Sequence, residues 1–369
     1  MKKLTIVLPT YNESGNIEKL INDIFAEQKN IANWELTILV VDSKSPDKTG
    51  EIVKKLQKKY HQLYLLEIEK AGLGKAYSEG FQYAFDHLNP YLMMEMDADI
   101  SHDPRDIPKF VHGIEKGADL VIGSRYIKGG SIPKDWGLHR KIFSIFANLF
   151  IRFGFMKLTI TDWTSGYRAI KSWVIKNLIN HVKKYSGYLF QIAVIDEVLK
   201  TGGHVTEVPI KFKERKFGKS KISFIQYISG IVIYILTNSS FIKFVIVGLI
   251  GFVIDFGISY LLIEKLRFTV WVATLISAET AIVANFVFNN FWSFAHKKIE
   301  HSFKSYSGSF IKFNVVSSGS LIIQSVGIQL LVNFLGRKLW YLYKVLIIAF
   351  IIIPYSYVLY NKFIWKEKK

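Results

Sequence analysis

Two carboxylates stand two residues apart directly after an apolar run. Asp97 and Asp99 follow Tyr91–Met96, which has the composition of a buried strand. Carboxylate oxygens are the ligands that hard divalent cations prefer, and a cation held by such a pair can neutralise a diphosphate. A surface loop can carry the same pair by chance, in which case the two aspartates are simply solvated. Their position at the end of a strand favours a metal and diphosphate site.

Polar and aromatic groups also follow two earlier apolar runs. Pro9-Thr-Tyr-Asn-Glu13 comes after Leu4–Leu8, and Asp42 comes after Thr37–Val41. An aromatic ring can stack on a base, and a carboxylate can accept hydrogen bonds from a base or a ribose. The alternative for the first segment is a plain turn that leads into a capped helix. Both segments are candidate contacts for a nucleoside.

Basic residues that suit phosphate binding lie in three segments further along the chain. Arg125 stands in Gly123-Ser-Arg125-Tyr, Arg140 stands in Leu138-His-Arg140-Lys, and Lys211–Lys221 holds several more. The planar fork of arginine binds phosphate oxygens in bidentate fashion. Solvated surface side chains are the alternative for the two arginines, and anionic lipid headgroups are an alternative target for the third segment.

Strands and helices that alternate along the first part of the chain must position these groups. The expected strands and helices are, in order, Leu4–Leu8, a helix near Asn16–Gln28, Thr37–Val41, Tyr64–Ile68, a helix at Lys75–His87, and Tyr91–Met96. This alternation predicts an α/β domain with a parallel sheet wound in βαβ units. Ligands bind beyond the carboxyl ends of the strands in such sheets. Pro9, Asp42 and Asp97 should therefore meet at one edge.

The second part of the chain predicts an all-α membrane domain. It carries four long apolar stretches, Phe244–Ile263, Val270–Phe294, Phe313–Leu335 and Val345–Tyr360. A span needs about 20 residues, and four such stretches joined by short charged connectors favour spans over buried helices of a soluble domain. Lysines gather in the second connector and in the tail. Because positive loops stay inside, we expect the catalytic domain and the C-terminus to be cytoplasmic, in a multi-pass protein of the cell membrane.

Some apolar or charged positions fit neither a plain soluble domain nor a plain span. Phe224–Leu236 and Ile142–Leu158 are too short or too interrupted to cross a membrane, and they fit helices lying in the membrane interface. A helix in the soluble core is the alternative for Ile142–Leu158.

Asp255 and Glu279 lie inside spans, where a charge costs about 2.5–3.5 kcal/mol. Either a structural pair or a polar passage would explain them.

Composition limits the possible functions. The chain has 369 residues, a net charge of +18 and no cysteine, which excludes a thiolate metal site, a catalytic thiol and disulfides. The basic residues spread over loops and membrane flanks, so a nucleic-acid partner is not expected. The predicted organisation is a catalytic domain at 1–221, an amphipathic helix and linker at 222–240, and a membrane domain at 241–369.

Six motifs stand in the order found in one known family. They are Pro9-Thr-Tyr-Asn-Glu13, Val40-Val-Asp42 with Ser45-Pro-Asp47, Asp97-Ala-Asp99, Gly123-Ser-Arg125-Tyr-Ile-Lys-Gly-Gly130, Asp162-Trp-Thr-Ser-Gly-Tyr-Arg168 and Gly187-Tyr-Leu-Phe-Gln191. The first 221 residues thus closely resemble the dolichol-phosphate (polyprenol-phosphate) mannose synthases of glycosyltransferase family 2. Two segments of the second part, Lys243–Gly251 and Asn285–Phe294, resemble the GtrA-like four-helix membrane domain.

The resemblance implies a GT-A (Rossmann-like) fold and an inverting transfer of mannose from GDP-mannose to a polyprenyl or dolichyl phosphate. It implies roles for the following residues: Pro9, Tyr11, Glu13, Asp42, Asp97 and Arg215 in binding the nucleotide-sugar; Asp97, Asp99 and Arg125 in catalysis; Arg125, Arg140 and Ser144 in binding the acceptor phosphate; Asp97, Asp99 and Ser101 in binding Mg²⁺ or Mn²⁺.

Two departures from the family pattern keep alternatives open. Ser43 and Lys44 follow Asp42 where further acids are usual, and Ser101 stands where a glutamine ligand is frequent. The donor could therefore be UDP-glucose or another hexose nucleotide. A different class of function is a non-catalytic partner that helps to translocate a lipid-linked sugar. A phosphate monoester is already ionised near neutral pH, since its second pKa is about 6, so transfer needs no general base.

Overall fold

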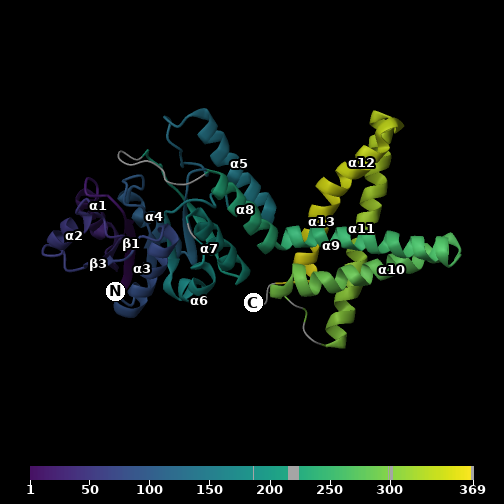
Figure 1. Cartoon of the computed structure of the whole chain (residues 1–369), viewed down its shortest axis with the longest axis horizontal. Helices are drawn as coiled ribbons and strands as arrows, with labels where there is room; N and C mark the ends of the chain where they lie inside the picture. The colour runs from purple at the N-terminus through teal and green to yellow at the C-terminus, as the bar shows by residue number, and fades with distance from the viewer. Residues whose placement is uncertain (186, 215–223, 298, 300–301, 367–369) are drawn as a thin grey trace. The chain divides into compact units, whose positions relative to one another are not determined.

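The computed structural model describes residues 1–185, 187–214, 224–297, 299 and 302–366. The chain divides into two compact units. The first comprises Met1–Phe153 and Lys157–Val232, and the second comprises Gly154–Met156 and Ile233–Lys369. Figure 1 shows the helices and strands of the whole chain, coloured from the N-terminus in purple to the C-terminus in yellow.

A seven-stranded mixed sheet forms the centre of the first unit. Its strands are β1 (Lys2–Thr10), β2 (Trp34–Asp42), β3 (Leu63–Glu67), β4 (Leu92–Glu95), β5 (Leu120–Ser124), β6 (Arg168–Lys171) and β7 (Val205–Pro209). They are arranged in the order β3-β2-β1-β4-β6-β5-β7. β6 runs antiparallel to both neighbours, and the remaining pairs are parallel. The four expected strands pair in parallel, as predicted, and the antiparallel β6 is an element that the sequence did not predict.

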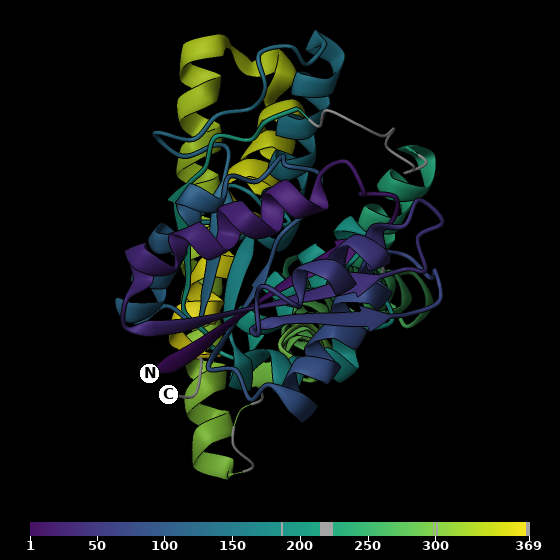
Figure 2. The same cartoon turned by 90° about the vertical axis from the view of Figure 1, so that its left-hand side faces the viewer.

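Helices cover both faces of this sheet (Figure 2). The helices in and next to this unit are α1 (Ile17–Ala26), α2 (Thr49–Leu56), α3 (Leu73–His87), α4 (Ile107–Glu115), α5 (Leu138–Phe155), α6 (Ser172–Val182), α7 (Tyr188–Lys200) and α8 (Phe224–Asn238), of which α5 and α8 end in the second unit. Short 3₁₀ turns occur at Glu27–Ile31 and Pro104–Asp106. The helices expected near Asn16–Gln28 and at Lys75–His87 correspond to α1 and α3.

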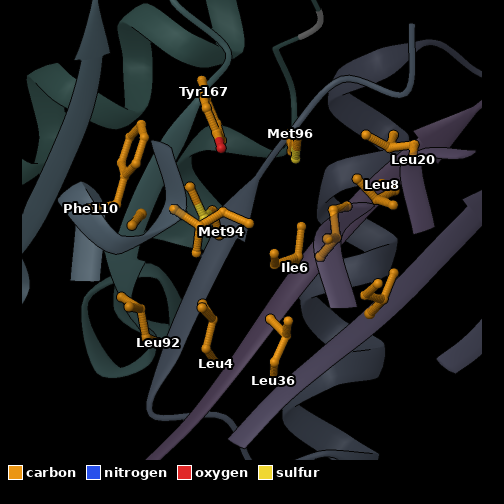
Figure 3. Packing of buried hydrophobic residues seen from close by; sticks show 14 of the residues in the cluster. Leu4, Ile6, Leu8, Leu20, Leu36, Leu92, Met94, Met96, Phe110 and Tyr167 are labelled. Carbon is orange, nitrogen blue, oxygen red and sulfur yellow. The ribbon is translucent and has the colours of Figure 1, made fainter. Parts of the chain in front are cut away.

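Successive side chains of each strand point to opposite faces of the sheet, so apolar side chains are buried on both faces. Leu4, Ile6 and Leu8 of β1 point to one face, where they pack with residues of β2, β4, α1, α2 and α4 (Figure 3). Val7 points to the other face. A methyl group at Gly80 of α3 would lie 2.7 Å from Val7 and 2.8 Å from Val41. The close approach of α3 to β1 and β2 thus requires a glycine at position 80.

α5 carries exposed apolar side chains along its length. Phe146, Phe150 and Phe153 are half or more exposed, and Leu138 at its start is more exposed still. The segment Ile142–Leu158 therefore forms a helix, as expected, with an unburied aromatic face. Its location in the membrane interface remains a prediction.

The second unit consists of long apolar helices. They are α9 (Ser240–Tyr260), α10 (Val270–Phe288), α11 (Phe303–Leu335), α12 (Trp340–Ile347) and α13 (Ile353–Phe363). π-helical turns at Leu261–Lys265, Asn289–Ser293 and Ile348–Ile352 and 3₁₀ turns at Ala295–Lys297 and Arg337–Leu339 extend or link them. Among the described residues, four continuous helices are long and apolar enough to cross a membrane: Ser240–Lys265, Val270–Ser293, Phe303–Leu335 and Leu342–Phe363. These coincide with the four expected spans, the third of which begins earlier than expected.

Aromatic packing joins the helices of this unit. Phe294 stacks on Trp365 with ring centroids 4.6 Å apart, and Phe313 stacks on Tyr360 at the same separation. α9 and α10 also lie side by side (Figure 1). Between them, the Ser277 hydroxyl donates a hydrogen bond of 2.5 Å to Asp255. One of the two carboxyl groups in the spans is therefore bonded to a neighbouring helix.

Candidate active site

The carboxyl ends of β2, β1 and β4 lie side by side and bring three loops together. Thr10 ends β1 in register with Asp42 at the end of β2, and its hydroxyl donates a hydrogen bond of 2.8 Å to that carboxylate. β4 ends at Glu95, two residues before Asp97. The meeting of Pro9, Asp42 and Asp97 at one sheet edge is thus confirmed, because these strands are adjacent and parallel.

The Asp42 carboxylate organises the loop after β2. It is buried, and besides Thr10 it accepts bonds from the Ser45 hydroxyl at 2.5 Å and the Ser45 N–H at 2.8 Å. Ser45 in turn accepts from the Asn12 N–H at 3.0 Å. Asp42 therefore ties the loops that follow β1 and β2 to one another. Direct contact of Asp42 with a nucleoside remains a prediction.

The loop after β1 presents an aromatic ring and a carboxylate. The Lys70 ammonium lies 3.6 Å from the centroid of the Tyr11 ring, and Glu13 accepts a hydrogen bond of 2.8 Å from the Asn16 side chain. Pro9, Tyr11 and Glu13 are all partly exposed. This exposure is compatible with the nucleoside contacts expected for these residues.

A stack of rings holds the loop that carries Asp97 and Asp99. The Asp97 N–H donates to Nδ1 of His102 at 3.0 Å, and the His102 ring stacks on Tyr167 with centroids 4.6 Å apart. Burial lowers the pKa of His102 to about 4, although Asp99 opposes this shift. The imidazole is therefore neutral and can accept this hydrogen bond. Asp99 is buried and accepts from the Ser101 N–H at 3.1 Å.

The oxygen atoms of this loop fit a divalent cation. Asp97 and Asp99 supply carboxylates, and the Ser101 hydroxyl is buried without a hydrogen-bond partner within the described residues. In those residues no group of three histidine or acidic side chains gathers as a complete metal site. Mg²⁺ is commonly bound by one or two carboxylates together with waters and substrate phosphates. An incomplete protein ligand set of this kind is thus compatible with Mg²⁺ or Mn²⁺.

Two buried charged residues that sequence reasoning missed lie on neighbouring strands beneath this loop. Glu95 of β4 and Arg168 of β6 are opposite one another in register, and both are fully buried. Burial raises the pKa of Glu95 to about 7 despite the charge of Arg168, and burial lowers the pKa of Arg168 to about 10. Arg168 donates hydrogen bonds to the carbonyls of Trp163, Ser165 and Gln191. These bonds fix the segment beside the strand from which Asp97 emerges. The apolar neighbours of Glu95 were the only sign in the sequence that this residue is buried.

Arg125 is held rigidly by Asp162. Its Nε and Nη2 donate to the two carboxylate oxygens of Asp162 at 2.7 Å each, and Nη2 also donates to the Thr164 hydroxyl. Burial lowers the pKa of Arg125, but the Asp162 charge outweighs burial and the pKa is raised overall. The Glu207 carboxylate accepts the N–H groups of Thr161 and Asp162 and so positions the carboxylate that binds Arg125.

One cavity collects several of the predicted residues. It is lined by Asp97, Ser101 and His102, by Arg125, Trp136 and Arg140, by Thr164, Ser165, Gly166 and Tyr188, and by Phe212 and Glu214. Asp97 and the two arginines expected to bind the acceptor phosphate thus lie around the same space.

Other predicted residues lie outside this lining. Ser144 of α5 shares a hydrogen bond of 2.5 Å with the Tyr126 hydroxyl, and Asp99 is buried behind the loop surface. Pro9, Tyr11, Glu13 and Asp42 belong to the neighbouring loops. Arg215 lies outside the described residues.

Glu214 and Trp136 are cavity residues that the sequence did not single out. Arg140 donates to both oxygens of Glu214, at 3.0 and 3.2 Å, and its guanidinium lies 3.9 Å from the centroid of the Trp136 ring. The Trp136 indole N–H donates to the same carboxylate. Because 74 residues separate Arg140 from Glu214, only the folded chain reveals their contact.

Comparison with known proteins extends these observations. Residues 5–179 match the family described as Glycosyl transferase family 2, and residues 243–365 match the family described as GtrA/DPMS, transmembrane domain. A dolichol-phosphate mannosyltransferase of Pyrococcus furiosus is 30% identical over 344 residues, which cover 90% of this chain and 92% of that protein.

Two further relatives match a smaller share of the chain. A polyprenol monophosphomannose synthase of Mycolicibacterium smegmatis is 35% identical over 60% of this chain and 82% of its own length. An undecaprenyl-phosphate mannosyltransferase of Micrococcus luteus is 35% identical over 60% of this chain and 88% of its own length. These relatives share an enzyme class, and the archaeal relative matches nearly the whole chain.

Proposed function

Since the chain belongs to the polyprenol-phosphate mannosyltransferases of glycosyltransferase family 2, we propose that it transfers mannose from GDP-mannose to a polyprenyl phosphate with inversion at the sugar. The observation that supports this most strongly is the cavity that Asp97, Arg125 and Arg140 line together. The acidic loop is suited to bind a divalent metal and the diphosphate of the donor, and the two arginines are suited to bind the phosphate of the acceptor. Both lie at this cavity. Such a cavity can hold both reacting groups at once.

The reaction requires that the acceptor phosphate be positioned next to the sugar and that the negative charge of the leaving diphosphate be neutralised. An oxygen of the acceptor phosphate attacks the anomeric carbon, a carbon–oxygen bond to the phosphate forms, and the bond to the nucleoside diphosphate breaks. Asp97, Asp99 and Ser101 would hold a divalent cation, which would neutralise the negative charge of the leaving diphosphate. The arginines orient the acceptor phosphate, which is already ionised near neutral pH. No side chain has to remove a proton.

The membrane helices give the enzyme access to its lipid acceptor. The lysine-rich connector and tail favour an orientation with the first unit and the C-terminus in the cytoplasm, where nucleotide-sugars are made available. The exposed aromatic face of α5 supports contact of the first unit with the lipid surface.

The choice of donor is tested by parallel transfer reactions. Membranes that contain the chain are incubated with polyprenyl phosphate, Mg²⁺ or Mn²⁺, and either radiolabelled GDP-mannose or radiolabelled UDP-glucose. We expect label in the organic phase from GDP-mannose alone, and loss of that label when EDTA removes the metal.

Membranes without the chain serve as the control for this experiment. Label from UDP-glucose alone would overturn the proposed donor while leaving the reaction class intact. Absence of lipid label from either donor would favour the alternative in which the chain is a non-catalytic partner of lipid-linked sugar translocation.

A further inference from the structure

The Glu214 carboxylate occupies an anion-binding position on Arg140. Both of its oxygens accept hydrogen bonds from Nη1 of Arg140, and the Trp136 indole N–H donates to one of them. The Trp136 ring packs under the guanidinium. A carboxylate of the same chain thus occupies, through one guanidinium nitrogen, a position on Arg140 that a phosphate oxygen could take.

The segment that carries Glu214 is anchored to the metal-binding side of the cavity. Lys213 donates to Asp103 at 2.9 Å, and the ring of Phe212 contacts His102 edge-on at a centroid distance of 5.6 Å. Phe212 also packs edge-on against Trp136 at 5.9 Å. The two residues before Glu214 therefore hold its segment beside the cavity through contacts that do not involve Arg140.

The solvent exposure of the Arg140–Glu214 pair indicates that another anion can replace Glu214 on Arg140. The side chains of Arg140 and Glu214 are 44% and 40% exposed, whereas those of Arg125 and Asp162 are 7% and 0% exposed. Ion pairs that are open to water are weak, whereas breaking a buried pair is strongly unfavourable. Of the two arginines that line the cavity, Arg140 is thus the one whose carboxylate partner an incoming anion can displace.

We infer that Glu214 is an internal competitor for Arg140 that the acceptor phosphate displaces and that returns when the product leaves. This inference rests on the proposed function. The acceptor is a phosphate monoester with a charge between about −1.5 and −2, and the product is a phosphodiester with a single negative charge. Arg140 attracts the product less than the acceptor, so the singly charged carboxylate regains Arg140 after transfer. Glu214 thereby limits the affinity of the site for both lipids.

The substitution Glu214→Gln tests this competition. The glutamine side-chain oxygen can still accept from Trp136 and Arg140, so the geometry is retained while the charge is removed. We expect the KM for polyprenyl phosphate and the inhibition constant of the glycosylated lipid product both to fall about two- to fivefold, the range of a weak exposed pair. The KM for the nucleotide-sugar should not change. The effect should shrink at high salt.

The matched control is Glu79→Gln. Glu79 forms an exposed pair with Lys75 on α3, with side chains 40% and 53% exposed, and it does not line the cavity. This variant removes the same charge and should leave both constants unchanged. An acceptor KM that is unchanged or raised in Glu214→Gln overturns the inference, because Glu214 would then merely support Arg140. A wild-type protein without transfer activity would instead overturn the proposed function.

Discussion

Replacing Asp99 by asparagine should lower kcat/KM for sugar transfer at least about a thousandfold, because the variant would lose a charged ligand of the proposed metal that neutralises the leaving diphosphate. The structure supports a stable variant. Asp99 accepts a hydrogen bond from the Ser101 N–H, and an asparagine oxygen can accept the same bond. The loss of activity should therefore occur without a loss of folded protein.

Metal binding provides a readout of Asp99 that is independent of activity. Electron paramagnetic resonance of Mn²⁺ in the presence of GDP should show tight binding by the wild type and weak binding by Asp99→Asn. Asp86→Asn is a suitable control, since Asp86 is bonded to Gln82 on α3 and lies away from the cavity. Normal transfer and normal Mn²⁺ binding by Asp99→Asn would disprove the assignment of Asp99 as a ligand.

Arg125→Ala should reduce the free energy of unfolding of the first unit by about 3–5 kcal/mol and abolish transfer. The substitution leaves the fully buried Asp162 carboxylate without its charge partner, which is among the costliest changes in a protein interior. Chemical denaturation of the full-length protein in detergent, followed by tryptophan fluorescence, measures this loss.

A double variant separates the structural role of Arg125 from its role toward the acceptor. Arg125→Ala combined with Asp162→Ala removes both charges and should regain part of the lost stability, yet it should remain inactive because the acceptor phosphate has lost a ligand. Arg140→Ala is the matched comparison. Its side chain is partly exposed, so this variant should stay folded and raise the acceptor KM. Activity of the double variant near the wild-type level would exclude a role for Arg125 in catalysis.

Much of the candidate site could be predicted because strand ends are visible in the sequence. Apolar runs that end in Pro9, Asp42 and Asp97 identify three strands, and parallel pairing then forces their ends to one edge. The four spans were equally predictable, since length and hydropathy alone define them. The antiparallel β6 was not predicted, because four residues with the sequence Arg-Ala-Ile-Lys give no periodic signal.

The partners of the charged residues could not be predicted. Arg125 and Asp162 are 37 positions apart in the sequence, and Arg140 and Glu214 are 74 positions apart. Local sequence patterns do not predict contacts between side chains at such separations. Glu95 stands in an apolar strand, and only the register of β4 with β6 reveals that it lies opposite Arg168. Sequence patterns thus identified the candidate substrate-binding groups, whereas only the structure reveals the groups that hold them in position.

The proposed transfer reaction is tested most directly by mass spectrometry of the lipid after reaction. Purified full-length protein is incubated with GDP-mannose, polyprenyl phosphate and Mg²⁺, and the lipid is extracted. We predict a new lipid that is heavier than the acceptor by one hexose residue, together with an equal amount of GDP. Unmodified lipid, whether the donor is intact or hydrolysed to free mannose, would contradict the proposal that this chain glycosylates a polyprenyl phosphate.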